Sequence, residues 1–370
     1  MEDHGKTDRK ASELLHLRQL SKGDPVSAPM VHASMYHLPG APDAAWTYGR
    51  TDNPTWHEVE AALAHLEGAP VVLFPSGMAA ISAAMFASLK AGARMLMPSD
   101  GYYSPRVLAE NFLERFGIKV ETRPTAAFAE GGFAGFELVF IETPSNPGLD
   151  LIDIAAVTQA VRDAGGRSVV DNTTMTALGQ HPLELGADIV VASDTKAPGG
   201  HSDLLMGHVA SRDPEILARI RDWRTYSGAI PGPMEAWLLL RGLESFEVRY
   251  DRMCRSAEII AGRLAEHASV ESLRFPGLPS DPSHNLARHQ MSRFGFLIHL
   301  TLSDADTAEA FIERCPYILP ATSFGGVHTS AERRLRWGDD VAPGAVRLSV
   351  GCEPVEALWS AIDAALTGAD

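Results

Sequence analysis

Short apolar runs alternate with helical patterns from Val71 onward, and this alternation constrains the fold more than any other feature of the chain. Five runs are interpreted as buried strands, at residues 71–74, 94–97, 138–141, 168–170 and 189–192. Helical patterns, for example at 79–89 and 154–164, lie between them. Buried strands alternating with helices are typical of a mostly parallel sheet covered by helices. The sequence therefore predicts an α/β fold.

Composition divides the chain into three parts. Residues 1–60 are rich in proline and show little periodicity, which predicts an extended arm that contacts a neighbouring subunit. Residues 61–235 hold the alternating pattern and are predicted to form an α/β domain. Residues 236–370 follow a Pro-Gly-Pro segment and are predicted to form a smaller α+β domain; its candidate strands are 295–301 and 345–350, and its closing helix is 356–366.

Charge and cysteine content exclude several classes of function. The 47 acidic and 32 basic residues give a net charge of −15, which disfavours nucleic acid and anionic membranes as partners. The charged N-terminus lacks a signal-peptide apolar segment, and no run of about 18 apolar residues occurs. Three widely spaced cysteines fit neither a disulfide framework nor a CxxC metal site. We expect a cytoplasmic enzyme with a small-molecule substrate and no metal.

Polar residues recur at the ends of the predicted strands, where ligands bind in open α/β sheets. They are Ser76, Asp100, Asn146, Asp171 and residues 193–196. Of six lysines, only Lys196 directly follows a buried strand. A desolvated lysine has a lowered pKa and can form an imine or act as a general base. The alternative is a solvent-exposed loop lysine, and this pattern alone does not separate the two.

Two segments have residues that could bind a phosphorylated ring. Asp171 ends a predicted strand, where its carboxylate could keep a pyridine nitrogen protonated; a helix N-cap is the simpler alternative. Residues 75–78 (Pro-Ser-Gly-Met) lie between a strand and a helix, where free N–H groups and the helix dipole can bind phosphate. Many strand-to-helix turns contain Ser-Gly, so this second signal is weak by itself.

Three further residues are candidates for binding anions. Tyr48 and Arg50 lie on one side of an extended chain, where they could hold a phosphate or merely anchor the arm. Arg347 lies in the apolar run 345–350, where an unpaired charge is unfavourable. A substrate carboxylate would explain Arg347, and so would a structural ion pair.

Two other enzyme classes fit the sequence poorly. Residues 201–203 (His-Ser-Asp) have the residue types of a hydrolase triad, but adjacent residues rarely converge as one, and no GxSxG motif occurs. No strand is followed by GxGxxG, which disfavours a dinucleotide-binding oxidoreductase.

The chain resembles the Cys/Met-metabolism family of pyridoxal-5′-phosphate (PLP) enzymes, which includes cystathionine γ-synthase, cystathionine γ-lyase, cystathionine β-lyase and methionine γ-lyase. The resemblance extends from about residue 27 to residue 353. It implies the PLP-dependent transferase (aspartate aminotransferase-like) fold. Its motifs, in order, are YGRTDNPT at 48–55, PSGMAA at 75–80, ETPSNP at 142–147, VDNT at 170–173, SDTK and GHSD at 193–203, SFGG at 323–326 and VRLSVG at 346–351.

The resemblance implies roles for the residues that hold the cofactor. Lys196 corresponds to the lysine that binds PLP covalently, and Asp171 to the partner of its pyridine nitrogen. Tyr103 resembles the tyrosine that stacks on the ring and assists proton transfer, although Tyr102 beside it leaves the register open. The residues that correspond to the phosphate-binding group are Ser76, Gly77, Met78, Ser193 and Thr195.

The resemblance also implies a carboxylate site and an oligomer. Asn146, Ser323 and Arg347 resemble the group that receives the substrate carboxylate, and Asn146 would also orient the cofactor. Tyr48 and Arg50 resemble a pair that reaches the phosphate from a neighbouring subunit. The site would then need at least a dimer, and we expect a homotetramer, which is common in the family.

The implied activity is that of a carbon–sulfur lyase of transsulfuration. Cystathionine γ-lyase is the leading expectation; cystathionine β-lyase and a γ-replacement enzyme remain alternatives. Thr47 and Thr322 occupy places where γ-acting members often carry carboxylates, which weakens the case for the usual recognition of the distal ammonium of cystathionine. A non-catalytic binding protein is also conceivable, but the presence of Lys196, Asp171 and Arg347 argues against it.

Overall fold

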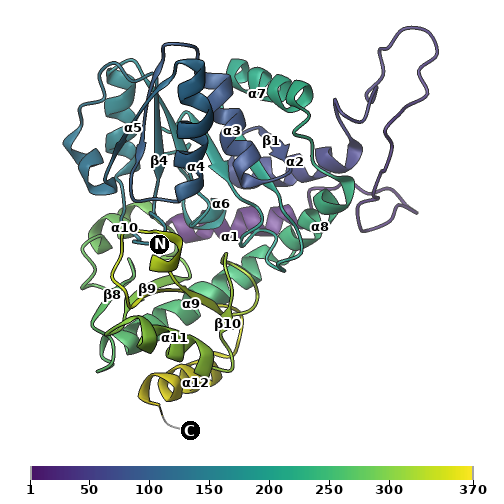
Figure 1. Cartoon of the computed structure of the whole chain (residues 1–370). Coiled ribbons are helices and arrows are strands. Elements are labelled where there is room, and N and C mark those ends of the chain that lie inside the picture. The colour runs from purple at the N-terminus through teal and green to yellow at the C-terminus, as the bar shows by residue number, and fades with distance from the viewer. Residues whose placement is uncertain (1, 369–370) are drawn as a thin grey trace.

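The computed structural model describes residues 2–368, which form two sheet-containing parts (Figure 1). The larger sheet has seven strands in the order β1-β7-β6-β5-β4-β2-β3. Strands β6, β5, β4, β2 and β3 are parallel, and β7 is antiparallel to both of its neighbours. The strands are β1 (Val71–Phe74), β2 (Arg94–Pro98), β3 (Lys119–Arg123), β4 (Leu138–Glu142), β5 (Arg167–Asp171), β6 (Ile189–Ala192) and β7 (Gly207–Ser211).

Helices cover both faces of this sheet, which explains why its central strands are apolar without alternation. In β5, Val169 belongs to one buried cluster and Val170 to another on the opposite face. Helices α3 and α7 contribute to the first cluster, and α2, α5, α8 and α9 to the second. The bounds are α2 (Pro54–Glu67), α3 (Gly77–Ser88), α5 (Ile154–Asp163), α7 (Pro214–Ser227), α8 (Pro233–Leu243) and α9 (Phe246–Ala265).

Shorter helices and turns complete the large part. Several of them border the strand ends at which the predicted site residues lie. They are α4 (Tyr103–Leu108), the π-helical turn η1 (Ala109–Leu113), the 3-10 turns η2 (Glu114–Phe116) and η3 (Thr125–Glu130), and α6 (Thr176–Gly179).

The smaller part contains a five-stranded sheet in the order β10-β11-β12-β9-β8. Its pairs are antiparallel except β10 with β11. Its elements are β8 (Ser272–Arg274), α10 (His284–Gln290), β9 (Leu297–Thr301), α11 (Ala305–Arg314), β10 (Leu319–Pro320), β11 (Ser330–Arg333), the 3-10 turn η4 (Leu335–Trp337), β12 (Ala345–Ser349) and α12 (Val355–Thr367). The mixed α/β fold is therefore confirmed, whereas the exact domain boundary near residue 235 stays a prediction.

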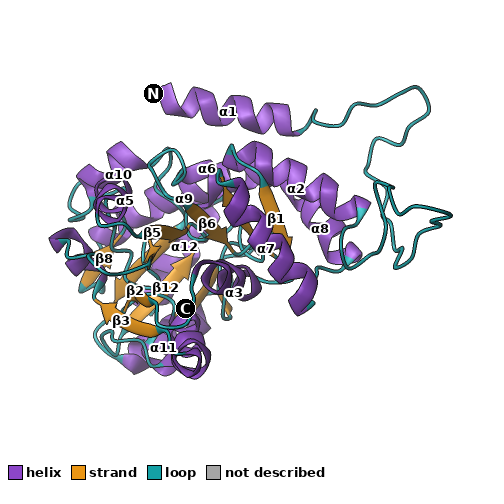
Figure 2. Ribbon diagram, turned by 90° about the horizontal axis from the view of Figure 1, so that it is seen from above, coloured by secondary structure: helices purple, strands orange, loops and turns teal. Residues whose placement is uncertain are grey.

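The N-terminal region differs from the predicted continuous arm. It begins with helix α1 (Glu2–Leu14), which packs beside α2 (Figure 2). Lys10 Nζ donates to the Leu66 carbonyl at 2.9 Å, and Thr7 is buried. Residues 15–53 then extend away from the rest of the chain as an irregular loop, as the prolines predicted (Figure 1). Proline content identified the loop, but it carried no information about the charged helix before it.

No helix within residues 2–368 combines the length and the apolarity needed to span a membrane. Nor do three or more histidine, cysteine, aspartate or glutamate side chains gather there in a way that could hold a metal ion.

Candidate active site

A cavity of about 400 Å³ opens at the carboxyl ends of β4, β5 and β6, beside the start of α3. Cofactor and small-molecule sites commonly have volumes of this order. Residues of the smaller part, including Phe324 and Arg347, form its other wall. The residues predicted to bind cofactor or substrate all line this cavity except Tyr48 and Arg50: Ser76, Gly77, Met78, Tyr103, Asn146, Asp171, Ser193, Thr195, Lys196, Ser323 and Arg347. The strand-end candidate Asp100 is not in the lining, and its carboxylate accepts hydrogen bonds from Thr125.

Lys196 lies in the turn after β6, with its side chain partly buried in the cavity. Its N–H donates to the Ser193 carbonyl at 3.2 Å, and its Nζ lies 5.2 Å from the ring centroid of Phe324. Burial and the charge of Arg347 lower the pKa of the amine to about 8, although Asp171 opposes this shift. The neutral, nucleophilic amine is therefore far more populated at physiological pH than that of an exposed lysine.

The start of α3 and the turn that carries Lys196 are packed directly together. Ser76 is the N-cap of α3, and its Oγ accepts a hydrogen bond from the Ala79 N–H at 3.1 Å. A Cβ added to Gly77 would lie only 2.6 Å from Ser193 Cβ, so only glycine allows this approach. The first turn of α3, where a helix leaves backbone N–H groups without intrahelical partners, thus adjoins Ser193, and Thr195 lines the same cavity. This arrangement is suited to phosphate.

Asp171 is the last residue of β5 and lies opposite Val191 of β6. It is buried and accepts a hydrogen bond from the Thr173 N–H at 2.9 Å. Burial raises the pKa of its carboxyl, and the Thr173 hydrogen bonds and the positive charge of Lys196 oppose that rise. Helix α6 has Met175 as its N-cap, so Asp171 is not the cap that the sequence left as an alternative.

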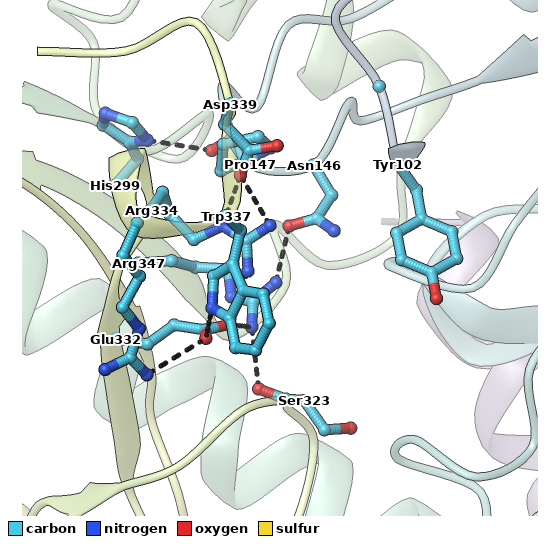
Figure 3. A network of polar contacts seen from close by, with 12 residues as sticks. Tyr102, Asn146, Pro147, His299, Ser323, Glu332, Arg334, Trp337, Asp339 and Arg347 are labelled. Atoms are coloured by element: carbon cyan, nitrogen blue, oxygen red, sulfur yellow. Dashed lines mark hydrogen bonds and ion pairs between the residues drawn. The ribbon is translucent and has the colours of Figure 1, made fainter. Parts of the chain in front are cut away.

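Arg347 is fixed at the junction of the two parts (Figure 3). Its Nη1 donates to Asn146 Oδ1 at 2.7 Å, and its Nη2 donates to the Ser323 carbonyl at 2.9 Å and to Glu332. Ser323 has φ of 75°, an unusual conformation for a residue other than glycine. Burial and the charge of Arg334 lower the pKa of Arg347 to about 10. The structural ion pair left open by the sequence is present, and Arg347 also lines the cavity.

Glu332 is the centre of a buried ionic network that the sequence did not predict. It faces Arg347 across β11 and β12, pairs with Arg334 at 2.5 Å and accepts a hydrogen bond from Trp337 Nε1 at 2.8 Å (Figure 3). Arg334 Nη2 in turn pairs with Asp339 at 2.6 Å. Nothing in the segment Ala-Glu-Arg-Arg distinguishes these charges from those of a solvated strand, so the burial of this network could not be predicted from the sequence.

Glu142, also missed, connects two walls of the cavity. Its carboxylate accepts the N–H groups of Tyr102 and Asn146, both at 2.7 Å. Burial and the neighbouring Asp171 raise the pKa of this carboxyl to about 8. Glu142 ends β4 as Asp171 ends β5, so the strand-end rule would have found it.

Both tyrosines of the ambiguous pair line the cavity. The rings of Tyr102 and Tyr103 contact edge to face, with centroids 5.4 Å apart, and are 37% and 40% exposed. Tyr102 lies close enough to Arg347 to influence its pKa. Neither exposure nor position singles out one ring, so the role given to Tyr103 stays a prediction.

Tyr48 and Arg50 lie outside the cavity of their own chain. Arg50 Nη1 donates to the Thr225 carbonyl at 2.9 Å, and its guanidinium lies 5.5 Å from the Tyr48 ring centroid. Tyr48 is 46% exposed. A role for this pair at the active site therefore requires another copy of the chain.

The cavity residues fit PLP group by group. The tight Gly77–Ser193 contact and the free helix N–H groups suit a phosphate. Asp171 offers a buried carboxylate to a pyridine nitrogen, and Lys196 offers an amine with a lowered pKa to an aldehyde. Tyr102 and Tyr103 provide aromatic surface.

Comparisons with known proteins agree with this geometry. The family model for Cys/Met metabolism PLP-dependent enzymes matches residues 12–367. A protein of Streptomyces coelicolor, provisionally named cystathionine gamma-lyase, is 46% identical over 345 residues, which cover 91% of this chain and 88% of that protein. Cystathionine beta-lyase of Lactococcus lactis subsp. cremoris is 34% identical over 361 residues, covering 92% and 94%.

A solved structure shares the whole fold. The crystal structure of cystathionine gamma synthase from Xanthomonas oryzae pv. oryzae, in complex with aminoacrylate and cysteine, aligns with a TM-score of 0.92 and 31% identity. The alignment covers 98% of this chain and 97% of that one. Sequence, fold and family model agree along nearly the full length, and the chain therefore belongs to the Cys/Met metabolism PLP-dependent enzyme family.

Proposed function

We propose that this enzyme is a carbon–sulfur lyase that converts cystathionine to cysteine, 2-oxobutanoate and ammonia. The observation that carries the proposal is that one cavity holds Lys196, Asp171 and Arg347: a reactive amine, a buried carboxylate and a fixed guanidinium. The similarity to a Streptomyces protein provisionally named cystathionine gamma-lyase supports the choice of substrate.

The proposed roles follow from the chemistry of each residue. Arg347, held by Asn146 and Ser323, binds the α-carboxylate of the substrate and so fixes the α-carbon near Lys196. Lys196 takes the α-proton and then moves a proton at the β-carbon before the sulfur leaves as the thiolate of cysteine. When bound, PLP supplies the electron sink for these steps, and Asp171 keeps its ring nitrogen protonated.

Two alternatives share the same residues. β-Elimination would give homocysteine, pyruvate and ammonia, and γ-replacement would join a thiol to an activated homoserine. The relatives include a cystathionine beta-lyase and a cystathionine gamma synthase, so similarity alone does not rank the three reactions. Thr322, which replaces a carboxylate often found in γ-acting members, lines the cavity and is the specific reason to keep β-elimination as the second candidate.

The keto acid formed from L-cystathionine tests the proposal. We expect 2-oxobutanoate and free cysteine from the wild type, and no keto acid from the Lys196→Ala variant. Pyruvate with homocysteine would replace the proposal with β-elimination. No keto acid, together with formation of cystathionine from cysteine and an acyl-homoserine, would replace it with γ-replacement.

We also propose that Tyr48 and Arg50 complete the cavity of a neighbouring subunit in a homotetramer. The exposed arm and the distance of this pair from its own cavity support that arrangement. A mixture of Arg50→Ala and Lys196→Ala chains, unfolded and refolded together, tests it. With random pairing about half of the dimers are hybrids, and each hybrid regains one of its two sites. Activity should therefore return to about a quarter of the wild-type value. No recovery in verified hybrids would show that the arm acts within its own chain.

A cytoplasmic location is part of the proposal. Cys254, Cys315 and Cys352 are all free thiols, which suits a reducing compartment. Fractionation of the producing cells tests this, and recovery of the enzyme outside the cytoplasm would contradict it.

A further inference from the structure

Three charged side chains are buried behind the turn that carries Lys196. His208 lies on β7, Asp194 precedes Thr195 in the turn, and Glu67 is the last residue of α2. Their exposed fractions are 2%, 0% and 3%. His208 Nδ1 lies 2.9 Å from Asp194 Oδ2, and His208 Nε2 lies 3.2 Å from Glu67 Oε1.

The geometry requires a charged histidine. A neutral imidazole has a single N–H, whereas here each ring nitrogen faces a carboxylate oxygen and both must donate. Burial alone would lower the pKa of His208, but Asp194 and Glu67 raise it to about 10. The other side chains at this place are apolar or carry only a hydroxyl, and they include Leu66, Thr173 and Phe246. The His208 cation therefore pairs with the Asp194 and Glu67 carboxylates in surroundings that no other charged side chain of residues 2–368 lines.

The Asp194 end of this group is continuous with the cavity. Asp194 points toward His208, whereas its neighbours Ser193, Thr195 and Lys196 all line the cavity. The Asp194 carbonyl also accepts the Gly199 N–H at 2.8 Å, which closes the turn. A displacement of the Asp194 side chain would therefore move the residues on both sides of it.

The His208 ring is also close to the second cofactor group. His208 lies opposite Ala192 at the end of β6, and β6 in turn pairs with β5, which ends in Asp171. The positive charge of His208 opposes the rise in the pKa of Asp171 that burial causes. The charged groups that act on one another here are thus Glu67 from α2, Asp194 from the turn, His208 from β7 and Asp171 from β5.

We propose that Glu67, His208 and Asp194 form an ionic anchor that positions the Ser193–Lys196 turn and favours the ionised form of the Asp171 carboxyl, so that its members are positioning residues for the cofactor. The inference rests on the cofactor roles proposed above for Lys196 and Asp171. It goes beyond them because it assigns a task to three residues that do not line the cavity.

Asp194→Asn and Glu67→Gln each remove one negative charge while preserving side-chain shape. The matched control is Glu60→Gln: Glu60 lies on the same helix α2 and pairs at 2.6 Å with the buried Arg224, and it also accepts the Leu73 N–H. Neither of these partners belongs to the Ser193–Lys196 turn. All three variants should lose stability. The readouts that separate positioning from stability are the dissociation constant of PLP and the pH midpoint of the visible absorbance of the holoenzyme.

We expect Asp194→Asn and Glu67→Gln to raise the PLP dissociation constant at least about tenfold, the effect of losing one charge-assisted contact, and to shift the absorbance midpoint. Glu60→Gln should leave both unchanged. Equal stability loss in all three with unaltered PLP binding would overturn the anchor and leave the proposed function intact. A wild type that binds no PLP would instead contradict the proposed function.

A measurement on the wild type covers the case in which a variant fails to fold. In histidine-labelled protein, at least one ring should keep imidazolium NMR signals at pH 9, because the pKa of His208 is about 10 rather than the usual 6.5. If every histidine ring is neutral by pH 8, the anchor does not exist, whatever the PLP result.

Discussion

Replacing Glu332 by glutamine should weaken binding of the substrate carboxylate, because it removes the buried charge that compensates Arg347. Glu332 is 1% exposed and compensates Arg347 and Arg334, which are themselves 3% and 5% exposed. Glutamine has the same shape but no charge, and its single side-chain oxygen can still accept a hydrogen bond. Asp339 would still pair with Arg334. The change therefore leaves Arg347 as the least compensated charge in the network.

The burial of Glu332 allows an estimate of how much unfolding free energy is lost and how far KM rises. Breaking a buried ion pair by removing one partner typically costs about 3–5 kcal/mol, because the other charge stays buried. The retained hydrogen bond and the Asp339 pair place Glu332→Gln near the lower end, at about 3 kcal/mol of unfolding free energy. Glu332 is the only charged partner among the three fixed contacts of Arg347. Without that charge the guanidinium is held less firmly, so KM for the amino-acid substrate should rise about tenfold, equivalent to about 1.4 kcal/mol.

Denaturant unfolding and steady-state kinetics measure the two effects, with Glu309→Gln as the control. Glu309 of α11 pairs at 2.8 Å with Arg333, the last residue of β11. Its side chain is 38% exposed, so its loss should cost at most about 1 kcal/mol and leave KM unchanged. If Glu332→Gln and Glu309→Gln had equal unfolding free energies, breaking the buried ion pair would cost no more than breaking the exposed one, contrary to the prediction. A lower KM in Glu332→Gln would mean that Glu332 competes with the substrate for Arg347 instead of positioning it.

Three further predictions concern the cavity. The pKa of Lys196 is lowered to about 8, so the rate of PLP uptake by the apoenzyme should rise roughly tenfold per pH unit up to about pH 8 and then level off; a flat profile in stopped-flow absorbance would contradict this. Arg347→Lys should lower kcat/KM at least about a hundredfold and leave PLP binding within twofold, measured by kinetics and absorbance titration; weakened PLP binding would contradict the carboxylate role. Of Tyr102→Phe and Tyr103→Phe, only the second should lower kcat about tenfold or more; the reverse result would move the proton-transfer role to Tyr102.

Local pattern was sufficient to predict five of the seven strands of the large sheet and most of the cavity lining, but β3 and β7 were not predicted. The runs that became β1, β4 and β6 are apolar throughout because helices cover both faces, and that signal is local in sequence. Because parallel strands end at one edge, the strand-end rule also predicted that Asp171, Asn146 and Lys196 would lie together.

The unpredicted parts depend on contacts between distant segments. His208 is an ordinary strand residue in sequence, and only the fold brings Glu67, 141 positions away, to its ring. Glu332 likewise lies in a charged run that resembles a solvated strand, yet it is buried against Arg347. Helix α1 was missed because its sequence is mostly polar: hydrogen bonds to the end of α2 help to hold it, and near its end Ala11 is buried and Leu14 packs against apolar residues.

Locating the bound cofactor on the chain shows directly whether Lys196 is the residue that carries PLP. Borohydride reduction fixes PLP to the amine that carries it, and mass spectrometry of the digested protein then identifies that residue among the six lysines. We expect the reduced PLP label on Lys196 alone in the wild type, and no label in the Lys196→Ala variant. A label on Lys6, Lys10, Lys22, Lys90 or Lys119, or no label in protein saturated with PLP, would contradict it.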